Sequence, residues 1–95
     1  MTWKRVDDNQ ALIVKALRKE GMTVQHLHAV GKGCPDLLVG FNGKNALLEV
    51  KDGNKPPSAR DLTPDQKIWH HNWNGHKSIV IDVESAIKEV KDACK

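Results

Sequence analysis

An Asn-Gly dipeptide between two apolar runs is the feature that most constrains how this chain of 95 residues can fold. The dipeptide is Asn42-Gly43, and the runs that flank it span residues 37–41 and 45–50. Both turn residues tolerate the positive φ of a type I′ turn, which makes this pattern the strongest short-range signal of a β-hairpin. The sequence therefore predicts two antiparallel strands joined by a two-residue loop.

That register places charged side chains at the open end of the hairpin. With a two-residue loop, Phe41 faces Lys44, and stepping outward brings Asp36 directly opposite Glu49. Cross-strand partners share a face of the sheet, with Cβ atoms roughly 5 Å apart. Lys51 lies two residues beyond Glu49 and so joins the same face. We expect two carboxylates and an ammonium group to converge there.

Two interpretations of this cluster are open. A solvated cross-strand salt bridge is the ordinary one for a generic hairpin. A divalent-cation site is favoured if Leu38 and Leu47, on the same face, are core residues, because charges at the end of a buried face are costly unless they bind something. A cation would also relieve the repulsion between Asp36 and Glu49. Oxygen ligands of this kind suit Mg²⁺ or Mn²⁺ better than zinc.

Three sequence blocks around this cluster resemble a nuclease family. The Pro-Asp at 35–36 and the Glu-Val-Lys at 49–51 are separated by twelve residues and are similar to the PD-(D/E)XK motif. The wider blocks Gly-Cys-Pro-Asp-Leu-Leu at 33–38, Leu-Glu-Val-Lys at 48–51 and Leu-Thr-Pro-Asp-Gln at 62–66 together resemble the VRR-NUC (virus-type replication-repair nuclease) domain of the PD-(D/E)XK nuclease superfamily. The resemblance runs from about Asp7 to Ile87, which is nearly the whole chain.

The resemblance implies a metal-dependent endodeoxyribonuclease, an enzyme that hydrolyses phosphodiester bonds and selects branched DNA as a Holliday-junction resolvase does. It implies Asp36, Glu49 and the backbone carbonyl of Val50 as ligands of Mg²⁺ (or Mn²⁺). Lys51 would orient the attacking water or stabilise the charged transition state. A lysine beside two carboxylates keeps its proton unless it is buried, which favours the electrostatic role. The alternative for Lys51 is a surface ion pair worth under about 1 kcal/mol.

Two glutamines enter the catalytic site through the same resemblance. Gln10 falls where many family members have an acidic residue on the first helix, so its amide oxygen would bind a metal or a metal-bound water without adding charge. Because Gln10 brings no charge, the presence of a second metal ion is left open. Asp7 or Asp8 is the candidate to replace the missing acidic residue. The alternative interpretation of Gln10 is an exposed residue in the first turn of the helix. Gln66 would reach the metal site or the DNA backbone. Its alternative is a capping box with Thr63, and we expect the two roles to exclude each other.

The segment after the hairpin, residues 52–62, reads as a cationic loop. Lys55, Ser58 and Arg60 are its candidate nucleic-acid-binding residues, contacting phosphates without reading base sequence. A solvated loop is the alternative interpretation.

The histidines and tryptophans carry further expectations. The His-x-His at 26–28 and the His-His at 70–71 lack the companions of a zinc site, although the first pair is also a candidate for the substrate groove. Trp69 and Trp73 lie one helical turn apart, and a core position is expected ahead of a dimer interface or base stacking.

The order of periodic segments predicts an α/β fold, α-β-β-β-α-β-α, with a mixed sheet flanked by helices. This matches the minimal restriction-endonuclease-like fold without singling it out. The first helix spans 9–20, is capped by Asp7 or Asp8, ends at Gly21, and buries Leu12, Ile13, Ala16 and Leu17. Strands follow over 22–29, 36–41 and 45–51. A second helix begins with the cap Thr63 and stops at 74–75. A strand over 78–81 is expected at the centre of the sheet. A last helix is capped by Asp82 and buries Val83, Ala86, Ile87 and Val90.

The amino-acid composition limits the number of domains and the classes of protein to which this chain can belong. With 39% hydrophobic and 28% charged residues, the chain is expected to form one small domain over 1–95 with a single modest core. A net charge of +3 permits nucleic-acid binding without requiring it. No run approaches the ~20 apolar residues of a membrane span, and no signal core is visible, which predicts a cytoplasmic protein, in the host cytoplasm if phage encoded. Cys34 and Cys94 are isolated and are expected to be free thiols.

The partners follow from the same reasoning. A four-way junction must be cut on two strands, and one short chain carries one active site, so similarity to junction-resolving enzymes implies a homodimer acting on branched DNA. A rival function is a non-catalytic DNA- or protein-binding module on a nuclease fold. The Gln10 departure supports this rival. Intact Asp36, Glu49 and Lys51 oppose it, because a pure binder has no need for two repelling carboxylates.

Overall fold

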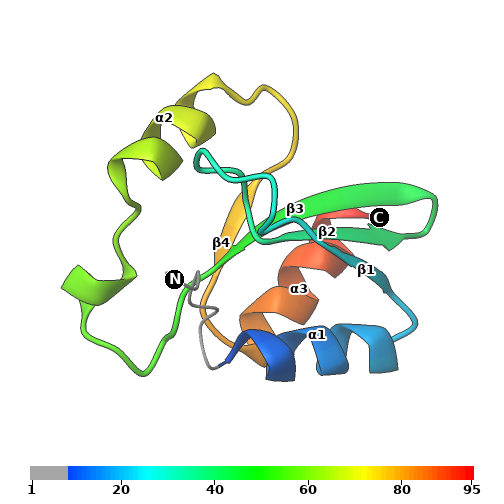
Figure 1. The fold of residues 1–95 in the computed structure, drawn as a ribbon. Coiled ribbons are helices and arrows are strands. Elements are labelled where there is room, and N and C mark those ends of the chain that lie inside the picture. The colour runs from blue at the N-terminus through cyan, green and yellow to red at the C-terminus, as the bar shows by residue number, and fades with distance from the viewer. Residues whose placement is uncertain (1–8) are drawn as a thin grey trace.

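The computed structural model of this protein describes residues 9–95, so the candidate caps and ligands Asp7 and Asp8 lie outside the described residues. The fold is α/β, as predicted (Figure 1). In chain order its elements are α1 (Gln10–Lys19), β1 (Thr23–His26), β2 (Leu37–Phe41), β3 (Lys44–Val50), a 3₁₀ helix η1 (Pro57–Arg60), α2 (Pro64–Asn72), β4 (Ser78–Val80) and α3 (Val83–Ala93).

The four strands form one mixed sheet in the order β1-β2-β3-β4. The first three strands are antiparallel and β4 is parallel to β3. The predicted hairpin and its register are confirmed: Phe41 pairs with Lys44, and the turn residues Asn42 and Gly43 have φ of 54° and 75°. The expectation of a central strand at 78–81 is wrong, because among residues 9–95 β4 lies at an edge of the sheet and pairs only with β3. Its apolar run suggested burial on both faces, yet Ile79 is 45% exposed.

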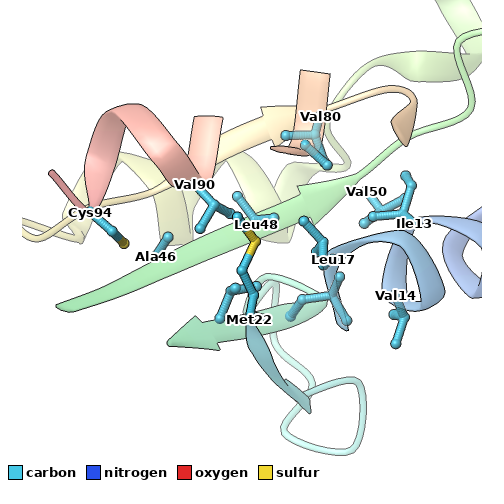
Figure 2. Close-up of a cluster of buried hydrophobic side chains, with 13 residues drawn as sticks. Ile13, Val14, Leu17, Met22, Ala46, Leu48, Val50, Val80, Val90 and Cys94 are labelled. Atoms are coloured by element: carbon cyan, nitrogen blue, oxygen red, sulfur yellow. The ribbon is translucent and has the colours of Figure 1, made fainter. Parts of the chain in front are cut away.

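The hydrophobic core lies between one face of the sheet and the helices α1 and α3. Figure 2 shows side chains from α1, α3 and β3 meeting there, among them Leu17, Leu48 and Val90. The placement of Leu38 and Leu47 in the core is corrected. Both runs are apolar on both faces, and the helices cover the face that holds Leu37, Val39, Ala46, Leu48 and Val50, so the alternate residues Leu38 and Leu47 are only half-buried on the opposite face.

The first helix buries a stripe that is rotated from the predicted one. Gln10, Ile13, Val14 and Leu17 are buried, at the i, i+3, i+4 and i+7 positions of a helix face, whereas Leu12 is 63% exposed. Leu12 was therefore wrongly assigned to the core. The apolar pattern allowed either of two adjacent stripes, and contact with the sheet selected the one that also buries Gln10. The helix ends at Lys19 with Glu20 as its C-cap, and Gly21 follows at the C′ position as predicted, with a φ of +86°.

The last helix follows the sequence closely. The Asp82 side chain accepts a hydrogen bond from the Ser85 N–H, and the Ser85 hydroxyl accepts one from the Asp82 N–H, which completes a capping box. Ala86 and Val90 are fully buried against the sheet, and Val83 and Ile87 pack at the edge of the core. The predicted buried face of this helix is confirmed.

The second helix is of a different kind. Thr63 and Gln66 form the predicted capping box, but α2 contains no buried residue. Trp69 and Trp73 stack with ring centroids 4.8 Å apart, and Trp73 is 42% exposed. The core position expected for the tryptophans is wrong, because α2 lies apart from α1 and α3 (Figure 1) and none of its residues is buried among residues 9–95. Among residues 9–95 no helix is long and apolar enough to cross a membrane.

Candidate active site

A cavity of about 460 Å³ opens where β2 begins and β3 ends, below the first turn of α2. Every residue predicted to be catalytic or metal-binding lines this cavity: Gln10, Asp36, Glu49, Val50, Lys51 and Gln66. They come from four parts of the chain, namely α1, the start of β2, the end of β3 and α2. The fold therefore brings together residues that the sequence separates by up to 56 positions, from Gln10 to Gln66.

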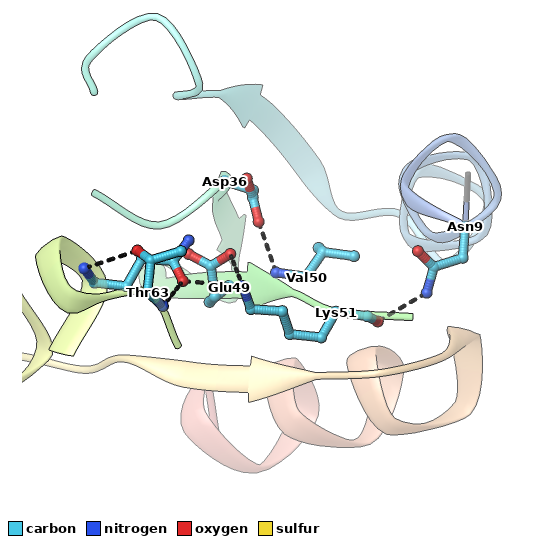
Figure 3. Close-up of polar contacts among 7 residues, drawn as sticks. Asn9, Asp36, Glu49, Val50, Lys51 and Thr63 are labelled. Atoms are coloured by element: carbon cyan, nitrogen blue, oxygen red, sulfur yellow. Dashed lines mark hydrogen bonds and ion pairs between the residues drawn. The ribbon is translucent and has the colours of Figure 1, made fainter. Parts of the chain in front are cut away.

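Asp36 is anchored to the neighbouring strand. Its Oδ2 accepts a hydrogen bond from the Val50 N–H at 2.7 Å, and its own carbonyl accepts one from the Leu27 N–H at 2.8 Å. Figure 3 shows the carboxylate directed at the Val50 backbone. The preceding Pro35 is fully buried and limits how the chain enters β2. The position of this carboxylate is therefore fixed by both flanking strands.

Glu49 and Lys51 form a buried ion pair. Their exposed fractions are 2% and 9%, and Lys51 Nζ lies 3.8 Å from Glu49 Oε2. This excludes the surface ion pair that was the alternative for Lys51. Removing two charges from water costs several kcal/mol per ion, and their attraction offsets this only with good geometry and further hydrogen bonds. A pair of this kind on the face away from the core indicates a role other than stability.

The backbone beneath Lys51 is held from two sides. Its N–H donates to the Val80 carbonyl at 2.9 Å, and its carbonyl accepts from the Asn9 side-chain amide at 2.9 Å. The same Asn9 amide also donates to the Ile81 carbonyl at 3.1 Å. The three contacts join the start of α1 to the ends of β3 and β4, which keeps Lys51 in a fixed position.

Gln66 performs both of the roles that were expected to exclude each other. Its Oε1 accepts one hydrogen bond from the Thr63 N–H and a second from Lys51 Nζ, each at 2.9 Å. That expectation was wrong because a carbonyl oxygen has two acceptor sites. The capping box of α2 and the active-site lysine therefore share one side chain.

Gln10 is 2% exposed, which excludes the alternative of an exposed first-turn residue. Its Nε2 lies 3.4 Å from His26 Nδ1, so the nitrogen of the Gln10 amide is in hydrogen-bond contact with the His26 imidazole. His26 does not itself line the cavity. The amide of Gln10 is thus held between β1 and the cavity, beside the carboxylates.

The three candidate nucleic-acid-binding residues are not part of the cavity wall. Lys55 and Ser58 are exposed on the segment that carries η1, which lies away from the sheet in Figure 1. Arg60 is half-buried, and its Nε is buried with no hydrogen-bond partner among residues 9–95. The structure therefore places these residues outside the cavity.

The turn at residues 31–34 and Asp65 also line the cavity, and sequence reasoning missed them. Gly33 has a φ of +82°, and a Cβ there would lie 2.3 Å from the Asp65 carbonyl oxygen and 2.8 Å from the Gln66 nitrogen. The turn therefore packs backbone-to-backbone against the first turn of α2. The only sequence signal was the Gly-Lys-Gly pattern, which predicts a turn but not what it contacts.

One histidine near the site has a shifted pKa. Burial lowers the pKa of His70 from its ordinary value, and the positive charges of Lys77 and Lys51 lower it further. Its Nε2 is buried and has no hydrogen-bond partner within the described chain. A neutral imidazole is therefore favoured beside Lys51.

The donors at the cavity fit a hard divalent cation. No group of three or more His, Cys, Asp or Glu side chains suited to a metal occurs between residues 9 and 95. Mg²⁺, however, is commonly held by one or two carboxylates with water in its other positions. Asp36 and Glu49 would supply such carboxylates, and the Val50 carbonyl and the Gln10 amide would supply neutral oxygens, because all four residues line the cavity. No disulfide joins Cys34 and Cys94.

Comparisons of this chain with known protein families, with curated proteins and with solved structures found no match.

Proposed function

We propose that this protein is an Mg²⁺- or Mn²⁺-dependent DNA endonuclease. The observation that carries the proposal is the buried Glu49–Lys51 pair, which shares one open cavity with the anchored carboxylate of Asp36. Charges buried on the face away from the core cost stability, and two carboxylates beside one cation suit the chemistry of a metal-dependent phosphodiesterase.

The element order supports a restriction-endonuclease-like fold of the VRR-NUC type. The order α-β-β-β-α-β-α is the one that this resemblance implies, and the candidate catalytic residues lie at the matching ends of the hairpin strands. The finer fold assignment is part of the proposal.

The chemistry divides among the residues of the cavity. A divalent cation there would supply Lewis-acid polarisation of the phosphate and a bound water of lowered pKa. Asp36 and Glu49 would hold the cation, with the Val50 carbonyl and the Gln10 amide oxygen as neutral ligands. Lys51, held by Gln66 Oε1 and Glu49, directs its positive charge at the phosphate oxygens, where charge develops in the transition state.

The substrate in this proposal is branched DNA, cut by a homodimer in the cytoplasm of the cell that makes the protein. Lys55, Ser58 and Arg60 contact DNA phosphates beside the cavity. Two chains supply the two cuts that a four-way junction requires. Two exposed apolar side chains, Ile68 on α2 and Trp73 at its C-cap, are available for contact between the chains. Size-exclusion chromatography with light scattering tests this part, and a monomer at micromolar concentration contradicts it.

The first test is cleavage of labelled four-way junction, flap and linear duplex DNA with Mg²⁺ or Mn²⁺. Lys51→Ala and Glu49→Gln are expected to lower cleavage about 100-fold or more, by analogy with the loss of one electrostatic donor at a transition state. Asp36→Asn keeps an acceptor for the Val50 N–H while removing the charge. It is therefore the variant that separates metal binding from folding.

Thermal melting completes the test. A cation that binds the folded state alone raises its stability, by about 2.7 kcal/mol at a hundred times Kd. We expect Mn²⁺ to raise the Tm of the wild type but not of Asp36→Asn. A wild type that binds DNA, cleaves none of the three substrates and shows no metal-dependent shift contradicts the nuclease and supports the non-catalytic binding module.

A further inference from the structure

We propose that Lys32 binds a backbone phosphate of the substrate at the mouth of the active-site cavity, next to the phosphate that is cleaved. This inference rests on the proposed nuclease function and names a residue that the sequence motifs do not contain. Four features of the turn at residues 31–34 lead to it: its backbone conformation, its fixed contact with α2, its place in the cavity wall and the availability of the Lys32 ammonium.

The backbone at Lys32 has a conformation that lysine rarely adopts. Gly31, Lys32 and Gly33 have φ of 73°, 54° and 82°, and the Cys34 N–H donates to the Gly31 carbonyl at 3.1 Å. This is a type I′ turn with Lys32 and Gly33 at its two central positions, where Gly, Asn and Asp are usual. Residues in disfavoured conformations cluster at functional sites. A lysine at this position therefore suggests that its side chain is needed there.

The turn is held rigidly over the cavity. Gly33 packs so closely on Asp65 and Gln66 that a side chain there has no space. Gln66 in turn binds Lys51 Nζ at 2.9 Å. The backbone of Lys32 is thus connected to the catalytic lysine through two short contacts, and its distance from the carboxylates is set by the fold.

The ammonium of Lys32 is available to a ligand. Lys32 and Lys51 are the cations among the residues that line the cavity, together with the acids Asp36, Glu49 and Asp65. Lys51 is buried and engaged by Gln66 and Glu49, whereas Lys32 is exposed and makes no ion pair or side-chain hydrogen bond within residues 9–95. Asp65, an exposed acid, lines the same cavity. A lysine acts on phosphate as a point charge and needs no fixed hydrogen-bond geometry.

The test measures binding of a fluorescein-labelled four-way junction by anisotropy as a function of salt, in EDTA so that no cutting occurs. Lys32→Asn keeps a residue that accepts positive φ and removes the charge. We expect it to weaken binding about three- to tenfold and to reduce the slope of log K against log salt by about one, the value for one lost phosphate contact. Lys32→Arg is expected to bind as the wild type does.

Two controls separate this role from others. Lys15→Gln removes the same charge from an exposed position on α1, in the helical layer, and is expected to leave the slope unchanged. The Tm of Lys32→Asn, and its increase with Mn²⁺, are expected to equal or exceed the wild-type values, because asparagine relieves the backbone strain. A lower Tm for Lys32→Asn, or equal losses of binding in Lys32→Asn and Lys15→Gln, would overturn the proposal.

The same data distinguish this inference from the proposed function. A wild type that binds the junction through Lys32 but shows no Mn²⁺ response refutes the nuclease and keeps the phosphate contact. A normal Mn²⁺ response and cleavage, with a wild-type salt slope in Lys32→Asn, refutes the phosphate contact alone. A wild type that does not bind the junction at all refutes this inference outright.

Discussion

The two faces of the sheet in this protein have different roles: one holds the hydrophobic core and the other holds the candidate active site. One face is covered by α1 and α3 and buries apolar side chains completely, including Leu17, Leu37 and Leu48. The other face holds a buried ion pair, an anchored carboxylate and a helix, α2, with no buried residue. Strand β3 makes this division residue by residue: Leu48 and Val50 point into the core, and Glu49 points into the cavity. Alternation along a strand separates stability from chemistry within one short segment.

The largest expected effect on stability comes from shortening one side chain on each side of the sheet, which tests whether only the face covered by α1 and α3 forms the core. Leu17→Ala removes a fully buried side chain, and we expect it to lower the free energy of unfolding by about 2–5 kcal/mol. Trp73→Ala removes a larger side chain that is 42% exposed on the open side and is expected to cost less. Urea unfolding followed by circular dichroism measures both. An equal or larger loss in Trp73→Ala would show that α2 belongs to the cooperative core.

A second test compares two glycines, one on each side. Gly21 and Gly33 have φ of +86° and +82°, but a Cβ at Gly21 meets nothing within 4 Å, whereas one at Gly33 meets the backbone of Asp65. Gly21→Ala is expected to cost about 1–3 kcal/mol from strain alone. Gly33→Ala is expected to cost more and to weaken the Tm increase with Mn²⁺, because the turn must move off α2. Equal effects on Tm, with an unchanged metal response, would contradict the contact.

A third test concerns the helix cap in the apolar layer. Asp82 accepts the Ser85 N–H at 2.7 Å, and this hydrogen bond lowers the pKa of the Asp82 carboxyl. Asp82→Ala is expected to lower stability by about 1 kcal/mol, since the first turn of α3 loses its cap. Asp82→Asn caps nearly as well and is the matched control. Cleavage activity is expected to stay at the wild-type level in both, because Asp82 does not line the active-site cavity.

The smallest expected effect is a pH dependence on the open side. Burial and neighbouring lysines lower the pKa of His70 in the folded state, so the unfolded chain binds more protons once the pH falls below about 6.5. The contribution of neutral His70 is fully present above that pH and is lost as the pH falls toward the lowered pKa. We expect Tm to fall less steeply between about pH 7.5 and 5.5 in His70→Gln than in the wild type. His71→Gln, an exposed neighbour, is the control, and parallel curves for all three proteins would contradict this role of His70.

Local signals in the sequence were sufficient for the hairpin and the residues at its open end. The type I′ turn at Asn42-Gly43 fixes the register, and the register places Asp36 across from Glu49 at the end of the two strands. The helix caps at Thr63 and Asp82 could also be predicted from the sequence, because a capping box is a contact between residues three positions apart. Contacts this short in sequence are determined by the chain itself.

Only the tertiary structure decided which face of the hairpin is buried, where β4 lies and what the turn at residues 31–34 touches. Leu37 and Leu38 are both apolar, so alternation alone could not choose between them until α1 and α3 covered one face. The strand β4 lies at an edge because the crossover through α2 returns the chain beside β3. The contact of Gly33 with Asp65 joins residues far apart in sequence, and no local propensity encodes such a pair. Contacts between residues distant in sequence, rather than the local sequence pattern, therefore determine the part of the cavity wall that the local motifs do not predict.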